Sequence, residues 1–224
     1  MKKTLLMAAA ALAAGIITSQ AQPVYSQNIV GYVNMPISGN AAYTMIVAPL
    51  QTANKTNNAE DLLPAVQAND NVLIFNGGGY DNYTFVVPGT WIGPSGPQAA
   101  PTLNAGTAFF YENNGSAYIT NTFVGTVVLS NSVAFTGSAV YNMVGSTAPI
   151  STDLESTNLN LPLQVNDTVL LFNGNGYDNY TFAGPGMWIG PSGPQTAPVI
   201  NVGQAFFYED NSGATNWVQN VVIP

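Results

Sequence analysis

Two groups of side chains in this sequence could bind a carbohydrate. Each group combines aromatic faces with a carboxylate and an amide: Tyr80, Asp81, Asn82 and Trp91 in the first, and Tyr177, Asp178, Asn179 and Trp188 in the second. An aromatic face stacks on the C–H face of a sugar ring, and carboxylate and amide groups hydrogen-bond to its hydroxyls. Two such sites on one chain would add avidity for a polysaccharide. Alternatively, these aromatic side chains pack in the cores and turns of small β-domains.

The residue types that most enzymes need are missing. The sequence contains no His, no Cys and no Arg, which removes the usual general base, thiol nucleophile, transition-metal ligands and phosphate clamp. Carboxylates remain, and two that face each other suffice for a glycosidase. However, Asp81 and Asp178 are equivalent positions of an internal repeat, as are Asp70 and Asp167, so a duplication explains both pairs. We therefore expect no enzymatic activity and no catalytic residues.

The composition limits cofactors and charged partners. Only 6% of residues are charged, and after residue 21 Lys55 is the only cation against 11 acids, a formal charge of −10. This balance excludes nucleic acids and anionic lipid surfaces, which bind clustered Lys and Arg. No metal or other cofactor is expected. Asp81 and its Asn-rich turn offer oxygen ligands for Ca²⁺, but without the alternating acids of a calcium loop.

An internal repeat organises the chain. Three pairs of segments share one offset of 97 residues: Leu73–Phe85 with Leu170–Phe182, Trp91–Gln98 with Trp188–Gln195, and Gly106–Glu112 with Gly203–Glu209. A unit of this length matches a small domain. We predict a first β-domain with an N-terminal strand arm at residues 22–123, and a duplicate of it at residues 124–224.

Within each unit the sequence indicates short strands. Val72–Phe75 is a β-rich run closed by Asn76-Gly77, a strong hairpin signal. Gly93–Pro97 is expected to be a stiff exposed loop because of its prolines and glycines, and Asn58–Leu63 a single helical turn. The prediction is an all-β fold of two tandem homologous domains, each a β-sandwich or barrel.

The N-terminus has the pattern of a cleaved secretory signal peptide at residues 1–21. Lys2 and Lys3 precede the apolar run Leu5–Ile17, which is too short to span a membrane, and Ser19-Gln20-Ala21 provides a cleavage site. We expect a secreted bacterial protein, located at the cell surface or in the extracellular space and not inserted in a membrane. With no cysteines, its stability must come from burial and sheet hydrogen bonds.

An aromatic-x-x-Asn-x-apolar segment occurs three times at the unit boundaries. The residues that define its three copies are Tyr25, Asn28 and Val30, then Tyr118, Asn121 and Phe123, and finally Trp217, Asn220 and Val222. In this interpretation the middle copy joins the two units, and the terminal copies can add to a sheet edge of another subunit. Repeated head-to-tail, such a contact produces a filament. Alternatively, each terminal strand pairs within its own domain.

The sequence resembles a group of uncharacterised secreted two-repeat β-proteins of Verrucomicrobia-like bacteria. The resemblance lies in Val24–Asn34 and in the Phe-Asn-Gly-x-Gly-Tyr, Trp and Gly-x-Ala-Phe-Phe-Tyr blocks, and it implies export and a two-lobed β-architecture. We expect a secreted, non-enzymatic structural protein of the cell surface or extracellular matrix, whose partner is itself and which assembles head-to-tail by strand addition. The alternative is a protein that binds a neutral polysaccharide through the paired Tyr, Trp, Asp and Asn sites.

Overall fold

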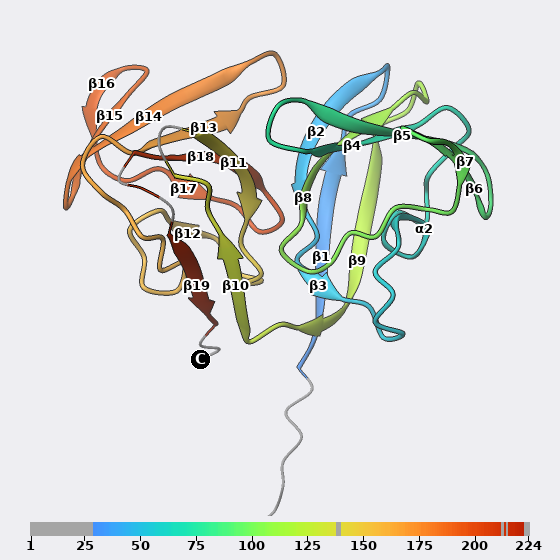
Figure 1. The fold of residues 1–224 in the computed structure, drawn as a ribbon, viewed down its shortest axis with the longest axis horizontal. Helices are drawn as coiled ribbons and strands as arrows, with labels where there is room; N and C mark the ends of the chain where they lie inside the picture. The colour runs from blue at the N-terminus through green and yellow to red at the C-terminus, as the bar shows by residue number, and fades with distance from the viewer. Residues whose placement is uncertain (1–28, 138–139, 212, 214, 222–224) are drawn as a thin grey trace, which may run out of the picture.

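The computed structural model describes residues 29–137, 140–211, 213 and 215–221. The described chain is almost entirely β-structure, with one four-residue helix, α2 (Ala59–Leu62), which confirms the predicted all-β fold class. Figure 1 shows two lobes side by side, one built from β1 to β9 and the other from β10 to β19. The predicted signal peptide, Tyr25, Asn28 and Val222 lie outside the described residues. None of the described helical residues forms a segment long and apolar enough to cross a membrane.

The first lobe consists of two antiparallel sheets, with strand orders β1-β9-β3 and β2-β8-β4-β5-β6-β7. Its strands are β1 (Val30–Ile37), β2 (Ala42–Val47), β3 (Leu50–Gln51), β4 (Asn71–Phe75), β5 (Tyr80–Val87), β6 (Thr90–Gly93), β7 (Gly96–Gln98), β8 (Ala108–Asn113) and β9 (Ile119–Val127).

The second lobe repeats the six-stranded sheet in the order β11-β18-β13-β14-β15-β16 and adds the pairs β10-β19 and β12-β17. The register Leu73↔Asn82 between β4 and β5 returns as Leu170↔Asn179 between β13 and β14. Its strands are β10 (Ser130–Ala134), β11 (Val140–Gly145), β12 (Thr152–Asp153), β13 (Thr168–Phe172), β14 (Tyr177–Gly184), β15 (Met187–Gly190), β16 (Gly193–Gln195), β17 (Val199–Ile200), β18 (Ala205–Asp210) and β19 (Asn216–Asn220).

Local turn chemistry explains the hairpins. The Asn76 side chain accepts hydrogen bonds from the N–H groups of Gly78 and Gly79, and Gly77 has a φ of +92°, so the predicted β4–β5 hairpin is confirmed. The prediction that Gly93–Pro97 is only a loop is wrong, because Gly96–Gln98 forms β7. Proline is tolerated there because β7 is an edge strand that pairs only with β6.

The division between the lobes lies later than the predicted boundary at residues 123 and 124. β9 continues unbroken to Val127 and pairs with β1 as far as Thr126. Val127 also pairs with Leu50 of β3. All of β9 therefore belongs to the first lobe, and Val128–Leu129 connects it to β10.

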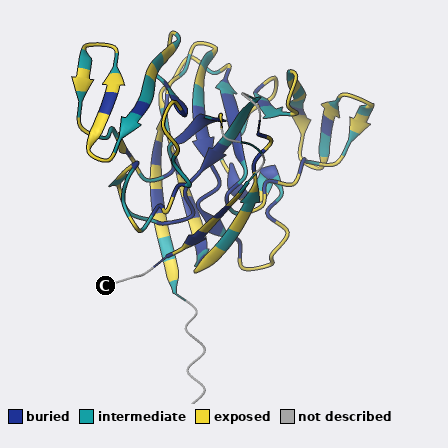
Figure 2. Ribbon diagram, turned by 60° about the vertical axis from the view of Figure 1, so that its left-hand side comes forward, coloured by how far each residue is buried: buried dark blue, intermediate teal, exposed yellow. Residues whose placement is uncertain are grey.

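Each lobe has its own core around a buried tryptophan. Trp91 and Trp188 are fully buried, and each donates its indole N–H to a glutamate, Glu60 or Glu155, over 2.8 Å. Figure 2 shows the buried residues concentrated in the interior of the molecule and exposed residues in its outer hairpins and loops.

A third apolar cluster joins the lobes. Phe75 lies edge-to-face on Phe207, and Phe110 lies edge-to-face on Phe172, both with ring centroids 5.1 Å apart. Phe75 and Phe172 are equivalent positions of the two repeats, as are Phe110 and Phe207, so each contact becomes the other when the repeats are exchanged. The same exchange appears in two isolated β-bridges, Ile46↔Gln204 and Thr107↔Val144. The two lobes are therefore packed around a pseudo-two-fold axis.

Candidate functional site

The tryptophans of the two predicted sugar sites are part of the cores. Trp91 and Trp188 have no exposed surface and pack against Phe85 and Phe182, with ring centroids 5.2 Å apart in each pair. A buried indole cannot stack on a sugar ring, so the assignment of both tryptophans to a binding site is wrong. Their position opposite a core phenylalanine in the β5–β6 and β14–β15 pairs explains the repeat of the Trp-Ile-Gly block.

The two tyrosines of the predicted sites meet at the junction of the lobes. Tyr80 and Tyr177 line one hollow between the lobes, and burial raises the pKa of both hydroxyls. Each remains about 40% exposed. A closed ring of edge-to-face and tilted contacts, with centroids 5.1–5.7 Å apart, holds them in place: Phe75, Tyr80, Phe110, Phe172, Tyr177 and Phe207. The structure thus merges what the sequence presents as two separate tyrosines into one site.

Two hollows adjoin this tyrosine pair. The smaller has a volume of about 210 Å³ and is almost entirely apolar; it is lined by Tyr43, Leu73, Tyr80, Phe110, Phe172 and Tyr177. The larger, of about 420 Å³, lies on the second lobe and is lined by Tyr177, Asp178, Asn179, Thr181, Ile189, Gly190 and Pro191. Tyr177 lines both hollows.

The aspartates of the predicted sites are partly engaged within their own turns. Asp81 accepts a hydrogen bond from the side-chain amide of Asn76 over 2.9 Å, and Asp178 accepts one from Asn173 over 3.0 Å. Asn82 and Asn179, next in sequence to these aspartates, are exposed. The described residues contain no group of three or more His, Cys, Asp or Glu side chains that could hold a metal ion.

Asp70 and Asp167 have a structural role that the sequence did not reveal. Both are fully buried, and each accepts hydrogen bonds from two backbone N–H groups and one tyrosine hydroxyl. The tyrosines are Tyr111 and Tyr208, whose pKa is raised by burial and by these hydrogen bonds. The carboxylates lie in separate lobes, and each is enclosed by its own donors.

The interpretation of three equivalent boundary strands is wrong in its details. Tyr118 is 63% exposed whereas Trp217 is buried, and Asn121 is buried whereas Asn220 is exposed. Side chains of a strand alternate between its two faces, so the copies present opposite faces to the core. Phe123 is also buried, and its strand β9 lies between β1 and β3 of the same lobe.

Both terminal strands that the structure describes pair within their own lobes. β1, which begins at the exposed Val30, pairs with β9, and β19 pairs with β10. The middle copy is therefore not a joint between the lobes. The lobes are joined instead by the aromatic cluster and by the connection at Val128–Leu129.

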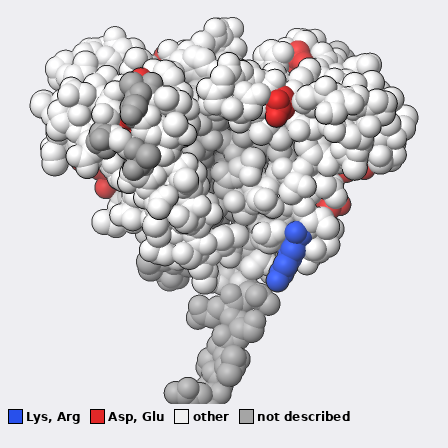
Figure 3. All heavy atoms as spheres, in the orientation of Figure 1, with Lys and Arg blue, Asp and Glu red and all other residues white. Residues whose placement is uncertain are grey.

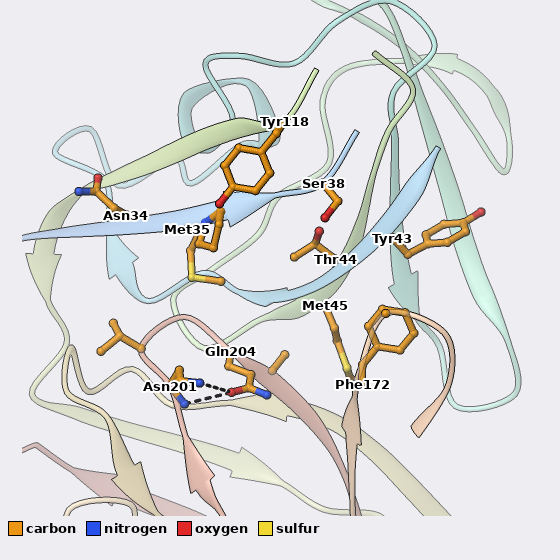
Figure 4. A pocket seen from close by; sticks show the side chains of 14 residues that line it. Asn34, Met35, Ser38, Tyr43, Thr44, Met45, Tyr118, Phe172, Asn201 and Gln204 are labelled. Atoms are coloured by element: carbon orange, nitrogen blue, oxygen red, sulfur yellow. Dashed lines mark hydrogen bonds between the residues drawn. The ribbon is translucent and has the colours of Figure 1, made fainter. Parts of the chain in front are cut away.

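A large cleft along strand edges is a feature that sequence reasoning missed. It has a volume of about 720 Å³, and none of its lining residues is charged. Figure 4 shows Met35 and Tyr118 of the first lobe on one side, and Asn201 and Gln204 of the second lobe on the other. The loop around Asn201 carries no motif, so only the packing of the lobes places it there.

A second uncharged cleft, of about 410 Å³, is the pseudo-symmetric counterpart. Where the first is lined by Met35 of β1 and Gln204, the second is lined by Val133 of β10 and Thr107. In both clefts an edge strand of one lobe faces a loop of the other. Figure 3 shows few and scattered charges on one face of the molecule, with the hollow between the lobes uncharged.

The edge of β1 along the large cleft has unpaired backbone groups. Among the described residues, β1 pairs with β9 alone. The N–H of Val127 donates to the carbonyl of Ile29 over 2.8 Å. Because bonded pairs alternate along an antiparallel ladder, the odd-numbered residues of β1 bond to β9 and the even-numbered residues face the free edge. Pro36 is even-numbered, which agrees with the rule that proline faces the unpaired side.

No family model, curated protein or solved structure matches this chain. The assignment of a site therefore depends on the geometry of its own residues. Two features stand out among the described residues: the free, uncharged edge of β1, and the exposed tyrosine pair at the lobe junction.

Proposed function

We propose that this is a secreted, non-enzymatic structural protein of the cell surface or extracellular matrix, whose copies associate by adding a strand to the free edge of β1. One observation carries the proposal. β1 is an eight-residue edge strand without a charged side chain, beside an uncharged cleft of about 720 Å³. Soluble proteins usually protect such an edge with lysine, a bulge or a covering loop, because it is a template for another strand. Here only Pro36 interrupts it.

The occupant that fits best is the segment of residues 22–28 of a second copy. It contains no charged side chain, which suits the uncharged lining of the cleft. Seven residues in extended conformation span roughly 23 Å, close to the length of the eight-residue β1. The segment also begins the aromatic-x-x-Asn-x-apolar pattern found in Tyr118–Phe123, part of which already pairs with the other edge of β1. Because donor and acceptor are different surfaces, the contact would propagate into a filament.

The test uses two variants at one exposed position of β1. Tyr32 is 73% exposed, and its backbone N–H faces the free edge. Tyr32→Pro removes that N–H, whereas Tyr32→Ala removes the side chain and keeps it. Particle size is measured by light scattering and by negative-stain microscopy of the purified mature protein. We expect filaments or oligomers for the wild type and for Tyr32→Ala, and monomers for Tyr32→Pro and for a variant lacking residues 22–28.

Two results would overturn the proposal. A wild type that stays monomeric at every concentration would exclude self-assembly. Assembly that survives in Tyr32→Pro would exclude the β1 edge. The same far-UV spectrum and urea midpoint for both Tyr32 variants would show that a loss of assembly does not come from unfolding.

A further inference from the structure

We propose that the tyrosine pair at the lobe junction is the centre of a single groove that binds a neutral polysaccharide. This inference concerns a different surface from the β1 edge and does not depend on strand addition. Its basis is that Tyr80 and Tyr177, one from each repeat, line the same hollow with about 40% of each exposed. The groove contains one composite site per chain, in contrast to one site per repeat.

The surface beside the tyrosines has the polar groups that sugar hydroxyls require. On the second lobe, the hollow of about 420 Å³ presents the amide of Asn179 and the hydroxyl of Thr181 next to the ring of Tyr177. That volume lies within the range of ordinary small-ligand sites. On the first lobe the equivalent positions hold Asn82, which is exposed, and Thr84, whose hydroxyl donates to the side-chain oxygen of Asn71 over 2.5 Å. In both lobes, polar side chains therefore follow the tyrosine along its strand.

The tyrosine rings are fixed before any ligand arrives. Each contacts two phenylalanines of the aromatic ring at the junction. A ligand that stacks on them would not have to order these side chains, which removes one cost of binding. The apolar hollow of about 210 Å³ beside Tyr43 gives the C–H face of a sugar ring a surface to cover.

Charge determines the class of polysaccharide. The described part of the chain contains a single cation, Lys55, and Asp178 itself lines the groove. An acidic glycan would meet a carboxylate and no basic partner, so the ligand is a neutral chain. Because the groove crosses from one lobe to the other, a ligand long enough to touch both lobes should bind better than a disaccharide.

Affinity electrophoresis provides the first measurement. The mature protein is run through native gels that contain mixed-linkage β-glucan, xylan, galactomannan or, as the acidic comparison, alginate. We expect retardation by at least one neutral polysaccharide and none by alginate. Tyr80→Ala and Tyr177→Ala should each weaken retardation by about tenfold, as expected for the loss of one stacking contact. Tyr80→Phe retains the ring and should bind within about threefold of the wild type.

Val165→Ala is the control, because Val165 is exposed and lines neither of the two hollows beside the tyrosine pair. It should bind like the wild type. No retardation by any neutral polysaccharide would overturn the proposal, as would retardation that neither Tyr80→Ala nor Tyr177→Ala changes. A urea midpoint within about 0.2 M of the wild type, the range of ordinary surface substitutions, would exclude unfolding as the cause.

Stoichiometry distinguishes one composite groove from two separate sites. Calorimetry with the hexasaccharide of the retained polysaccharide should give one ligand per chain, and either tyrosine variant should weaken that one event. Two ligands per chain, reduced to one in each variant, would contradict the composite groove. Because none of these substitutions touches β1, failure here would leave the outcome of the strand-addition experiment unchanged.

Discussion

Tyr111→Phe should measure how much the buried carboxylate of the first lobe stabilises the fold. Asp70 has no exposed surface. It accepts hydrogen bonds from the Tyr111 hydroxyl and, over 2.8 Å each, from the backbone N–H groups of Gln67 and Asn114. These contacts connect the turn before β4 to the end of β8. The substitution removes one hydroxyl and leaves the ring in place, so it isolates one hydrogen bond.

The expected loss in free energy of unfolding is about 2 kcal/mol. A hydrogen bond to a charged acceptor contributes roughly 1.5–3 kcal/mol, and phenylalanine preserves the packing of the ring. The Asp70 carboxylate keeps its two backbone N–H donors, so the substitution does not leave a buried charge without hydrogen bonds. Asp70→Ala removes all three bonds and leaves the donors buried, which should cost about 4 kcal/mol.

Urea unfolding followed by tryptophan fluorescence is the assay, because Trp91 lies in the core of the same lobe. With a slope of about 2–3 kcal/mol/M, the midpoint of Tyr111→Phe should fall by roughly 0.7–1 M. Tyr118→Phe removes an exposed hydroxyl and should leave the midpoint unchanged. A Tyr111→Phe midpoint equal to that of the wild type would refute the assignment, since the hydroxyl would then contribute nothing to stability.

Two further predictions concern alkaline pH and the junction. Burial, together with the hydrogen bonds to their aspartates, raises the pKa of the Tyr111 and Tyr208 hydroxyls above the ordinary value of about 10. The folded state therefore keeps protons that the unfolded chain loses, and urea midpoints should be equal at about pH 7 and about pH 9 and fall as the pH rises above about 10. Phe207→Ala removes the buried ring that packs on Phe75 and should destabilise the protein by about 3 kcal/mol in the same assay. An equal effect from Val199→Ala, an exposed residue, would contradict that reasoning.

Features that depend on neighbours in the chain could be predicted from the sequence. The Asn76-Gly77 hairpin follows from turn chemistry within four residues, and the all-β class follows from many short strands separated by such turns. The repeat of 97 residues indicates that the second lobe copies the six-stranded sheet of the first. Even here, the prediction that Pro97 lies in a loop is wrong, because a proline is tolerated in β7 only as that strand lies at the edge of the sheet, which the sequence does not show.

The candidate sites depended on contacts between distant residues, which the sequence does not display. The sequence of an aromatic-rich motif does not show whether its tryptophan is exposed or buried. Only the packing of the sheets places Trp91 and Trp188 in the cores. The tyrosines are 97 residues apart, and only the pseudo-two-fold packing of the lobes brought Tyr80 against Tyr177. The sequence also does not show which face of each boundary strand is buried, because a shift of one residue in strand pairing moves every side chain to the opposite face of the sheet.

The repeated Tyr-Asp-Asn motif and its tryptophan are therefore explained partly by the sequence and partly by the tertiary structure. By itself the sequence determined that the motif occurs twice, that it combines aromatic rings with a carboxylate and an amide, and that the chain contains no His, Cys or Arg. Tertiary structure decided which of its residues reach the surface and that both copies share one junction. Local propensity is encoded over a few residues, whereas burial and the meeting of the two repeats depend on the relative placement of whole sheets.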